Sequence, residues 1–138
     1  MTPVKVKVPD VLKVRSLVES AELEVSFLLT VEPSRSSSST VVQGVYEVFR
    51  KLGEALLLFR GKEATGRDSH SMMIQELYSL PVSSSRSVHV LENLKSLRHG
   101  VNYDGYIPTI VEVTEALDIA RELFDPVVVA VKREVGLL

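Results

Sequence analysis

The residue types best suited to chemistry gather in the stretch from 97 to 106, Leu-Arg-His-Gly-Val-Asn-Tyr-Asp-Gly-Tyr. Arg98 carries a planar guanidinium, which binds phosphate groups through paired hydrogen bonds. His99 carries an imidazole, which exchanges protons near neutral pH. An amide, a phenol and a carboxylate follow within five residues. The stretch therefore predicts a polar site, whose ligand-binding candidates are Arg98, Asn102, Tyr103 and Asp104 and whose catalytic candidates are Arg98 and His99.

Each of these residues also has a structural interpretation. At a helix end, Arg98 could satisfy backbone carbonyls or pair with Asp104. Tyr103 and Tyr106 could stack on a base, but amphipathic aromatic side chains more often pack at a subunit interface. The secondary binding candidates are Tyr46, His70 and Tyr106. The three histidines lack the spacing of a metal-ligand pattern, so we expect neither a metal nor a cofactor.

Composition narrows the class of protein. A chain of 138 residues with 45% hydrophobic side chains is large enough to bury one core. A formal charge of −2 argues against a strongly basic nucleic-acid-binding domain, although a local basic patch is compatible with it. The sequence has no cysteine, which excludes disulfides and thiolate chemistry. No apolar run is long enough to span a bilayer and no signal peptide is evident, so we expect a cytoplasmic protein.

The spacing of apolar residues predicts the helices that position the polar stretch. One helix opens at Pro9-Asp10 and ends before Glu32-Pro33, and the others span about 41–60, 71–80, 86–98 and 110–124. In the longest of them, apolar side chains recur every three or four residues. Residues 1–9 are predicted to form an extended arm that alternates Val and Lys and could pair across a dimer, and residues 10–138 to form one domain. The pattern is an all-α, antiparallel up-and-down bundle of four to five helices.

Local signals refine this outline. Gly44 and Gly53 lower helix propensity, by about 1 kcal/mol each, which indicates the close approach of a neighbouring helix. Thr109 and Glu112 have the spacing of a capping box. Asp125-Pro126 either kinks the last helix or restarts it. Residues 127–131 have the composition of a strand, but their apolar positions keep helical spacing, so helix is favoured.

Two separated segments together resemble the HEPN (higher eukaryotes and prokaryotes nucleotide-binding) family. Within 39–61, Tyr46, Phe49 and Ala55-Leu56-Leu57 are followed by a closing Gly61 and then by Ser69-His70. The second segment is Leu94-Lys95-Ser96-Leu97-Arg98, followed by Asn102-Tyr103-Asp104. The resemblance covers residues 11–133. It implies a dimeric bundle of about four main helices, similar to nucleotidyltransferase substrate-binding subunits, and a minimal nucleotidyltransferase as partner.

Many HEPN proteins are ribonuclease toxins of toxin–antitoxin pairs, with an arginine followed four to six residues later by a histidine. Here those positions hold Asn102, Tyr103 and Asp104, and His99 directly follows the arginine. Neither a tyrosine nor an aspartate readily replaces an imidazole that shuttles protons near neutral pH. The resemblance is therefore closer to the non-catalytic branch. We expect a homodimeric module that binds a nucleotide, RNA or a nucleotidyltransferase; the alternative is a metal-independent ribonuclease that uses Arg98 and His99.

Overall fold

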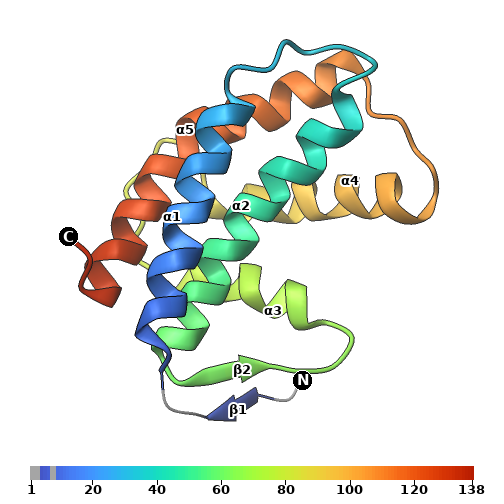
Figure 1. Cartoon of the computed structure of the whole chain (residues 1–138). Coiled ribbons are helices and arrows are strands. Elements are labelled where there is room, and N and C mark those ends of the chain that lie inside the picture. Colours follow the sequence, from blue (N-terminus) through green and yellow to red (C-terminus); the bar gives the residue numbers. More distant parts are fainter. Residues whose placement is uncertain (1–3, 7–8) are drawn as a thin grey trace.

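The computed structural model describes residues 4–6 and 9–138, and in this part of the chain the fold is predominantly helical (Figure 1). Two short strands accompany the helices, and two 3-10 turns, Leu77–Ser79 and Val88–Val90, lie between α3 and α4. The elements are β1 Val4–Val6, α1 Val11–Leu28, α2 Ser38–Phe59, β2 Lys62–Ala64, α3 Ser69–Glu76, α4 Leu91–Tyr103 and α5 Ile110–Val135.

Helix α2 is the centre of the fold, because it packs against α1, α3, α4 and α5. Apolar side chains cover most of its circumference, and even Tyr46 and Phe49 are fully buried. Phe49 meets Phe124 of α5 edge to face, with ring centroids 5.9 Å apart. A helix that is apolar on nearly all sides must be enclosed by others, so α2 provides the scaffold on which the remaining helices are placed.

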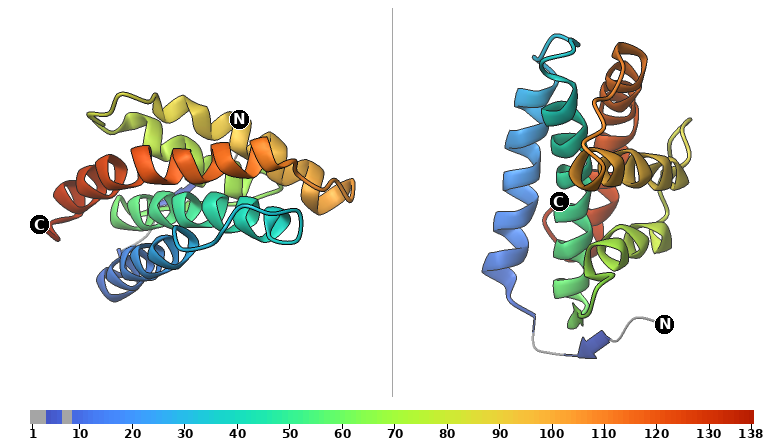
Figure 2. Two further views of the ribbon diagram at one scale, coloured as in Figure 1. Left: turned by 90° about the horizontal axis from the view of Figure 1, so that it is seen from above. Right: turned by 90° about the vertical axis from the view of Figure 1, so that its right-hand side faces the viewer.

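The helices do not all alternate in direction. Figure 1 shows α1 and α2 antiparallel, whereas α5 runs in the same general direction as α2. Helix α4 lies across α2 rather than along it, and both views in Figure 2 agree with this crossing. The prediction of an all-α protein is confirmed, but the simple up-and-down order applies only to α1 and α2. The crossing of α4 matters because it places the polar stretch beside α2 and opposite α3.

The predicted N-terminal arm has a partner within its own chain. Strand β1 pairs antiparallel with β2, with Val4 opposite Ala64 and Val6 opposite Lys62. Residues 4–6 therefore have a partner strand within the chain, whereas pairing across a dimer stays a prediction; the remaining arm residues 1–3 and 7–8 lie outside the described part. Strand β2 was not expected from the sequence, because three residues between Gly61 and Gly66 carry too short a pattern to predict a strand.

The fourth helix differs from its prediction at both ends. It begins at Leu91 rather than near residue 86, and it continues through Gly100 to Tyr103 instead of stopping at Arg98. The helix ends where the Gly100 carbonyl accepts from the amides of Asp104 and Tyr106, at 3.0 and 3.1 Å. His99, Asn102 and Tyr103 are therefore helical residues, whose side chains point in different directions around α4.

The last helix is continuous, so the restart at Asp125-Pro126 is not formed, and the preference for helix over 127–131 is confirmed. Pro126 has no N–H to donate to the carbonyl of Glu122, four residues earlier. That carbonyl accepts instead from the Ser84 hydroxyl at 3.3 Å. Arg86 reinforces the contact by binding the Glu122 carboxylate at 2.6 and 2.9 Å. The loop before α4 is thus attached to α5 where the helix ladder is interrupted.

The two helical glycines of α2 do permit close approaches, as predicted. A Cβ on Gly53 would lie 1.8 Å from the backbone oxygen of Met73 in α3, and one on Gly44 would lie 2.8 Å from Leu28 Cδ2 in α1. The Thr109–Glu112 capping box is also present at the start of α5. None of the helices in the described residues combines the length and apolar character that a membrane crossing requires.

Candidate functional site

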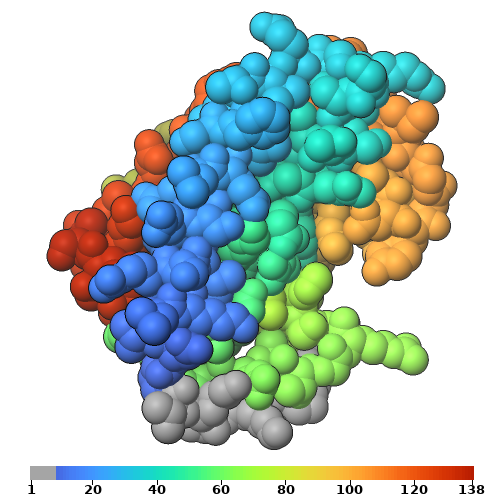
Figure 3. All heavy atoms as spheres, in the orientation of Figure 1, coloured from blue at the N-terminus to red at the C-terminus, as the bar shows by residue number. Residues whose placement is uncertain are grey.

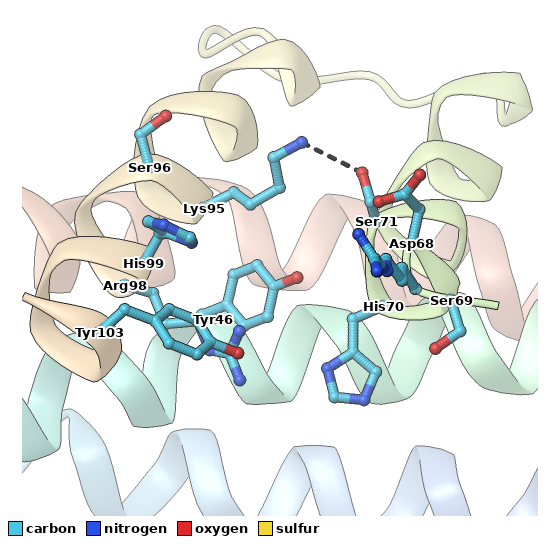
Figure 4. Close-up of a pocket in the computed structure, with 11 residues that line it drawn as sticks. Tyr46, Asp68, Ser69, His70, Ser71, Lys95, Ser96, Arg98, His99 and Tyr103 are labelled. Atoms are coloured by element: carbon cyan, nitrogen blue, oxygen red, sulfur yellow. Dashed lines mark hydrogen bonds between the residues drawn. The ribbon is translucent and has the colours of Figure 1, made fainter.

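A polar cleft of about 640 Å³ lies between the N-terminal end of α3 and one face of α4, with α2 as its floor. In Figure 3 it is the notch between the orange surface of α4 and the lime surface of α3 and its preceding loop. Figure 4 shows the side chains from the two helices on opposite sides of it. The lining residues are Tyr46, Arg67, Asp68, Ser69, His70, Ser71, Lys95, Ser96, Arg98, His99 and Tyr103.

Arg98 rests on the floor of the cleft. Its guanidinium carbon lies 4.7 Å from the centre of the Tyr46 ring, a cation–π contact between α4 and α2. The Asn102 amide lies on the other side of Arg98; when its oxygen faces the guanidinium, it accepts from Nη2 at 3.2 Å. The alternative pairing of Arg98 with Asp104 is not formed, and no carboxylate of the described residues forms an ion pair with Arg98. The guanidinium is therefore positioned by neutral groups and is available to an anion.

Tyr46 is 1% exposed as a residue, and no described residue hydrogen-bonds to its hydroxyl, which is the part of the side chain that reaches the cleft. Figure 4 shows that this hydroxyl points into the cleft, toward the side formed by α3. Burial raises the pKa of Tyr46, against the opposing effect of the nearby Arg98 charge. The phenol thus keeps its proton at ordinary pH. It presents a hydrogen-bond donor at the bottom of the cleft.

The first turn of α3 adds backbone donors. Asp68 occupies the N-cap position, but its side chain makes no capping hydrogen bond. The amides that such a cap ordinarily satisfies belong to His70 and Ser71, and neither has an acceptor among the described residues. The pKa of His70 is lowered, mainly by burial and then by the Arg50 and Arg98 charges. His70 is consequently neutral at neutral pH, and its imidazole could accept a proton.

Lys95 links the two sides of the cleft. Its Nζ donates to Ser71 Oγ at 3.0 Å, across from α4 to α3 (Figure 4), and lies 3.2 Å from Glu92. The Tyr78 hydroxyl also binds Glu92, and this hydrogen bond lowers the pKa of the Glu92 carboxyl. Because Glu92 stays ionised, Lys95 stays paired with an anion. An arrangement in which a neutral Lys95 activates the Ser71 hydroxyl as a nucleophile is therefore not favoured.

An aromatic pair forms one rim of the cleft. The rings of His99 and Tyr103, one helical turn apart on α4, are in contact with centroids 4.6 Å apart and planes tilted by 42°. Tyr103 is 71% exposed, which is unusual for a large aromatic side chain. Such an exposed ring offers a flat surface on which a base could stack.

The structure brings together some of the predicted site residues and separates others. Arg98, His99, Tyr103, Tyr46 and His70 all line the cleft. Asn102 contacts Arg98 from outside it, whereas Asp104 and Tyr106 border a different depression, between α4 and α5. The Tyr106 hydroxyl is bound to Glu112 there. Of the six candidates in the stretch 97–106, three thus line the cleft and three lie outside it.

Arg67, Lys95 and Ser71 were not predicted as site residues. Lys95 lies three residues before Arg98, so helical spacing alone places both on one face of α4. Arg67 and Ser71 had no comparable signal, because their approach depends on how α3 is seated. With them the cleft contains three permanent cations and, among the described residues, one lining carboxylate, Asp68. This balance favours an anionic ligand.

Comparison with known proteins adds no assignment: no family model, curated protein or solved structure matches this chain. The function is therefore argued from the cleft itself.

Proposed function

We propose that this protein is a helical binding module whose α3–α4 cleft holds a nucleotide or another phosphate-bearing ligand. The observation that carries the proposal is Arg98, a cation held over Tyr46 without a carboxylate partner among the described residues. Phosphate matches the planar fork of a guanidinium. Arg67 and Lys95 supply further positive charge, and the exposed Tyr103 ring supplies a stacking surface for a base.

Calorimetric titration with the four ribonucleoside triphosphates, each in turn, tests this proposal. We expect at least one to bind, and we expect Arg98→Ala to weaken that binding by about tenfold or more, the usual effect of losing a hydrogen bond to a charged group. Arg15→Ala is the matched control, because it removes the same charge from an exposed position on α1 outside the cleft. Equally weak heats for wild type and Arg98→Ala would remove the nucleotide from the proposal.

The HEPN resemblance extends the proposal to a homodimer and to a minimal nucleotidyltransferase as partner. Exposed apolar side chains support an additional interface. They occur on α1 and around the start of α5, and include Leu23, Phe27, Ile107, Ile110 and Val111. Sedimentation equilibrium over a range of concentrations checks the dimer, and a monomer at every concentration would contradict it. Co-purification with a nucleotidyltransferase encoded beside this protein would support the partner.

A second candidate function is a metal-independent ribonuclease. One observation favours it: His70 and His99, from α3 and α4, line the same cleft as Arg98. The two imidazoles could act as general base and general acid on a phosphodiester, while Arg98 stabilises the developing charge. Incubation with RNA in the presence of a chelator tests this, with His70→Ala and His99→Ala run in parallel. Intact RNA, or equal cleavage by the variants, would eliminate the enzyme.

A further inference from the structure

We infer that the floor of the cleft is a subsite for a terminal phosphate monoester, so that the ligand is a nucleotide or an oligonucleotide end rather than an internal phosphodiester. This inference rests on the proposed function and specifies which part of the ligand enters the cleft. Two independent features carry it: the unpartnered hydroxyl of Tyr46, which faces the cleft, and the uncapped first turn of α3.

Residues from three helices line the cleft and supply its donors. The Tyr46 hydroxyl rises from α2 at the floor, where no described residue hydrogen-bonds to it. The backbone amides of His70 and Ser71 point outward from the N-terminal end of α3, where the helix dipole also favours an anion. Arg98 and Lys95 approach from α4 on the remaining side.

The chemistry of the phosphate group favours the end of a nucleotide chain over an internal position as the ligand of this subsite. A monoester presents three terminal oxygens and a charge of about −1.5 to −2 at pH 7. An internal phosphodiester has two non-bridging oxygens and a single charge, and it carries a nucleoside on both sides. To bring its phosphate to the Tyr46 hydroxyl at the floor of the cleft, a phosphodiester would have to place a nucleoside on each side of that hydroxyl. A terminal phosphate can reach it with only one substituent, which leaves toward the Tyr103 rim.

Negatively charged groups, which would repel a phosphate, are few at this subsite. Asp68 is the one carboxylate among the described lining residues, and it is exposed. Glu92 lies outside the lining and is already engaged by Tyr78 and Lys95. An entering dianion therefore meets donors from three elements and little repulsion at the floor.

Four probes test the inference by calorimetry, in adenine and uracil series: the nucleoside, its 5′-monophosphate, the unphosphorylated dinucleotide and the 5′-phosphorylated dinucleotide. We expect the two monoesters to bind about tenfold or more tightly than their unphosphorylated counterparts. The mononucleotide and the phosphorylated dinucleotide distinguish a free nucleotide from a chain end as the source of the phosphate.

The decisive variant is Tyr46→Phe, which removes the hydroxyl and keeps the ring beneath Arg98. We expect it to weaken binding of the monoesters several-fold, on the scale of one hydrogen bond to a charged acceptor, and to leave the unphosphorylated dinucleotide unchanged. Tyr106→Phe is the matched control, since its hydroxyl binds Glu112 outside the cleft. Circular dichroism verifies that both variants are folded.

The outcomes separate the inference from the proposed function. If both dinucleotides bind equally, or if Tyr46→Phe binds the monoesters like wild type, the terminal-phosphate subsite is wrong and the nucleotide-binding function stands. If none of the probes binds, the nucleotide version of the proposed function fails and the subsite fails with it.

Discussion

The guanidinium carbon of Arg98 lies 4.7 Å from the centre of the Tyr46 ring, so a cation of α4 is seated on an aromatic side chain of α2. Contacts of this kind contribute about 0.5–2 kcal/mol, depending on exposure. The ring fixes one face of the guanidinium and leaves the N–H groups at its edge for a ligand. The contact between Arg98 and Tyr46 therefore connects α2, the central helix of the fold, to the cleft-lining face of α4.

Replacing Arg98 by lysine separates charge from shape. Arg98→Lys keeps the positive charge but loses the planar fork and most of the stacking on Tyr46. We expect nucleotide affinity between that of wild type and that of Arg98→Ala, with a loss of stability of about 1 kcal/mol or less. Calorimetry and urea unfolding measure the two effects. Affinity equal to wild type would mean that Arg98 acts only as a point charge.

The pKa of His70 reports on the charge in the cleft. Burial lowers this pKa from 6.5, and the Arg50 and Arg98 charges lower it further. Because the folded-state pKa lies below the unfolded value, the contribution of His70 to stability is complete above pH 6.5 and is lost as the pH falls. We expect Arg98→Ala to raise the pKa of His70 in an NMR titration. Arg15→Ala should leave it unchanged, and equal shifts in both variants would contradict a local effect.

Tyr46 makes the protein sensitive to alkali. Burial raises its pKa above 10.0, so the folded state holds this proton at a pH where the unfolded chain releases it. The contribution to stability is therefore complete below pH 10 and is lost as the pH rises further. Tyr46→Phe should unfold at a higher pH than wild type. The effect is partial, because burial and the bond to Glu92 also raise the pKa of Tyr78. Unchanged alkaline unfolding of the variant would refute this.

The two glycines of α2 should differ sharply when replaced by alanine. At Gly53 the new methyl would meet the Met73 backbone at 1.8 Å, which cannot be relieved without moving α3. We expect a loss of about 3 kcal/mol. At Gly44 the neighbour is the flexible end of Leu28 at 2.8 Å, and helix propensity favours alanine, so the change should stay within about 1 kcal/mol. Urea unfolding measures both, and equal costs would argue against the seating of α3 on Gly53.

The start of α5 depends on its capping box. The Thr109 hydroxyl accepts from the Glu112 amide at 3.1 Å, and the Glu112 carboxylate accepts from the Thr109 amide at 2.9 Å. Thr109→Ala should lower the free energy of unfolding by about 1 kcal/mol. Thr109→Ser retains the hydroxyl and should remain close to wild type. A serine variant as unstable as the alanine variant would point to the lost methyl group instead.

The features predicted correctly from sequence are local ones. The apolar stripe of α1 requires only the helical period, and the buried positions Val14, Val18 and Val25 follow it. The capping box is visible as two residues three apart. Gly44 and Gly53 indicated close packing, because glycine lowers helix stability and is favoured inside a helix where a neighbour approaches closely. In each case the signal lies within one turn or one face of a helix.

The errors arise where distant segments decide the outcome. The fourth helix was expected to stop at Arg98, before Gly100. It continues to Tyr103 and ends where the amides of Asp104 and Tyr106 donate to the Gly100 carbonyl. A restart at Pro126 was an open alternative because Ser84, which donates to the carbonyl that Pro126 leaves free, is far away in sequence. The partner of β1 was likewise too short to recognise.

The cleft could likewise be predicted only in part, because distant segments of the chain meet in it. Arg98 was identified from its residue type and neighbours, but its contact with Tyr46 depends on the crossing of α4 over α2. Because the residues of the polar stretch lie on different faces of α4, Arg98 and Tyr103 line the cleft and Asp104 lies outside it. Tyr46 was a secondary candidate through the HEPN resemblance alone, because a tyrosine in an apolar stripe otherwise resembles any other core aromatic.

The attachment of Ser84 to the Glu122 carbonyl bears on how insertions would be tolerated. Serine-rich loops ordinarily accommodate changes in length, because little in the fold depends on their register. Here one hydroxyl must arrive opposite the carbonyl that Pro126 leaves free, with Arg86 two residues later on the same glutamate. An insertion after Ser84 would disrupt that pairing, whereas one before Ser83 would preserve it. The serine-rich loop thus contains one residue, Ser84, whose position is fixed by the fold. The segments before and after Ser84 should therefore evolve under different constraints on their length.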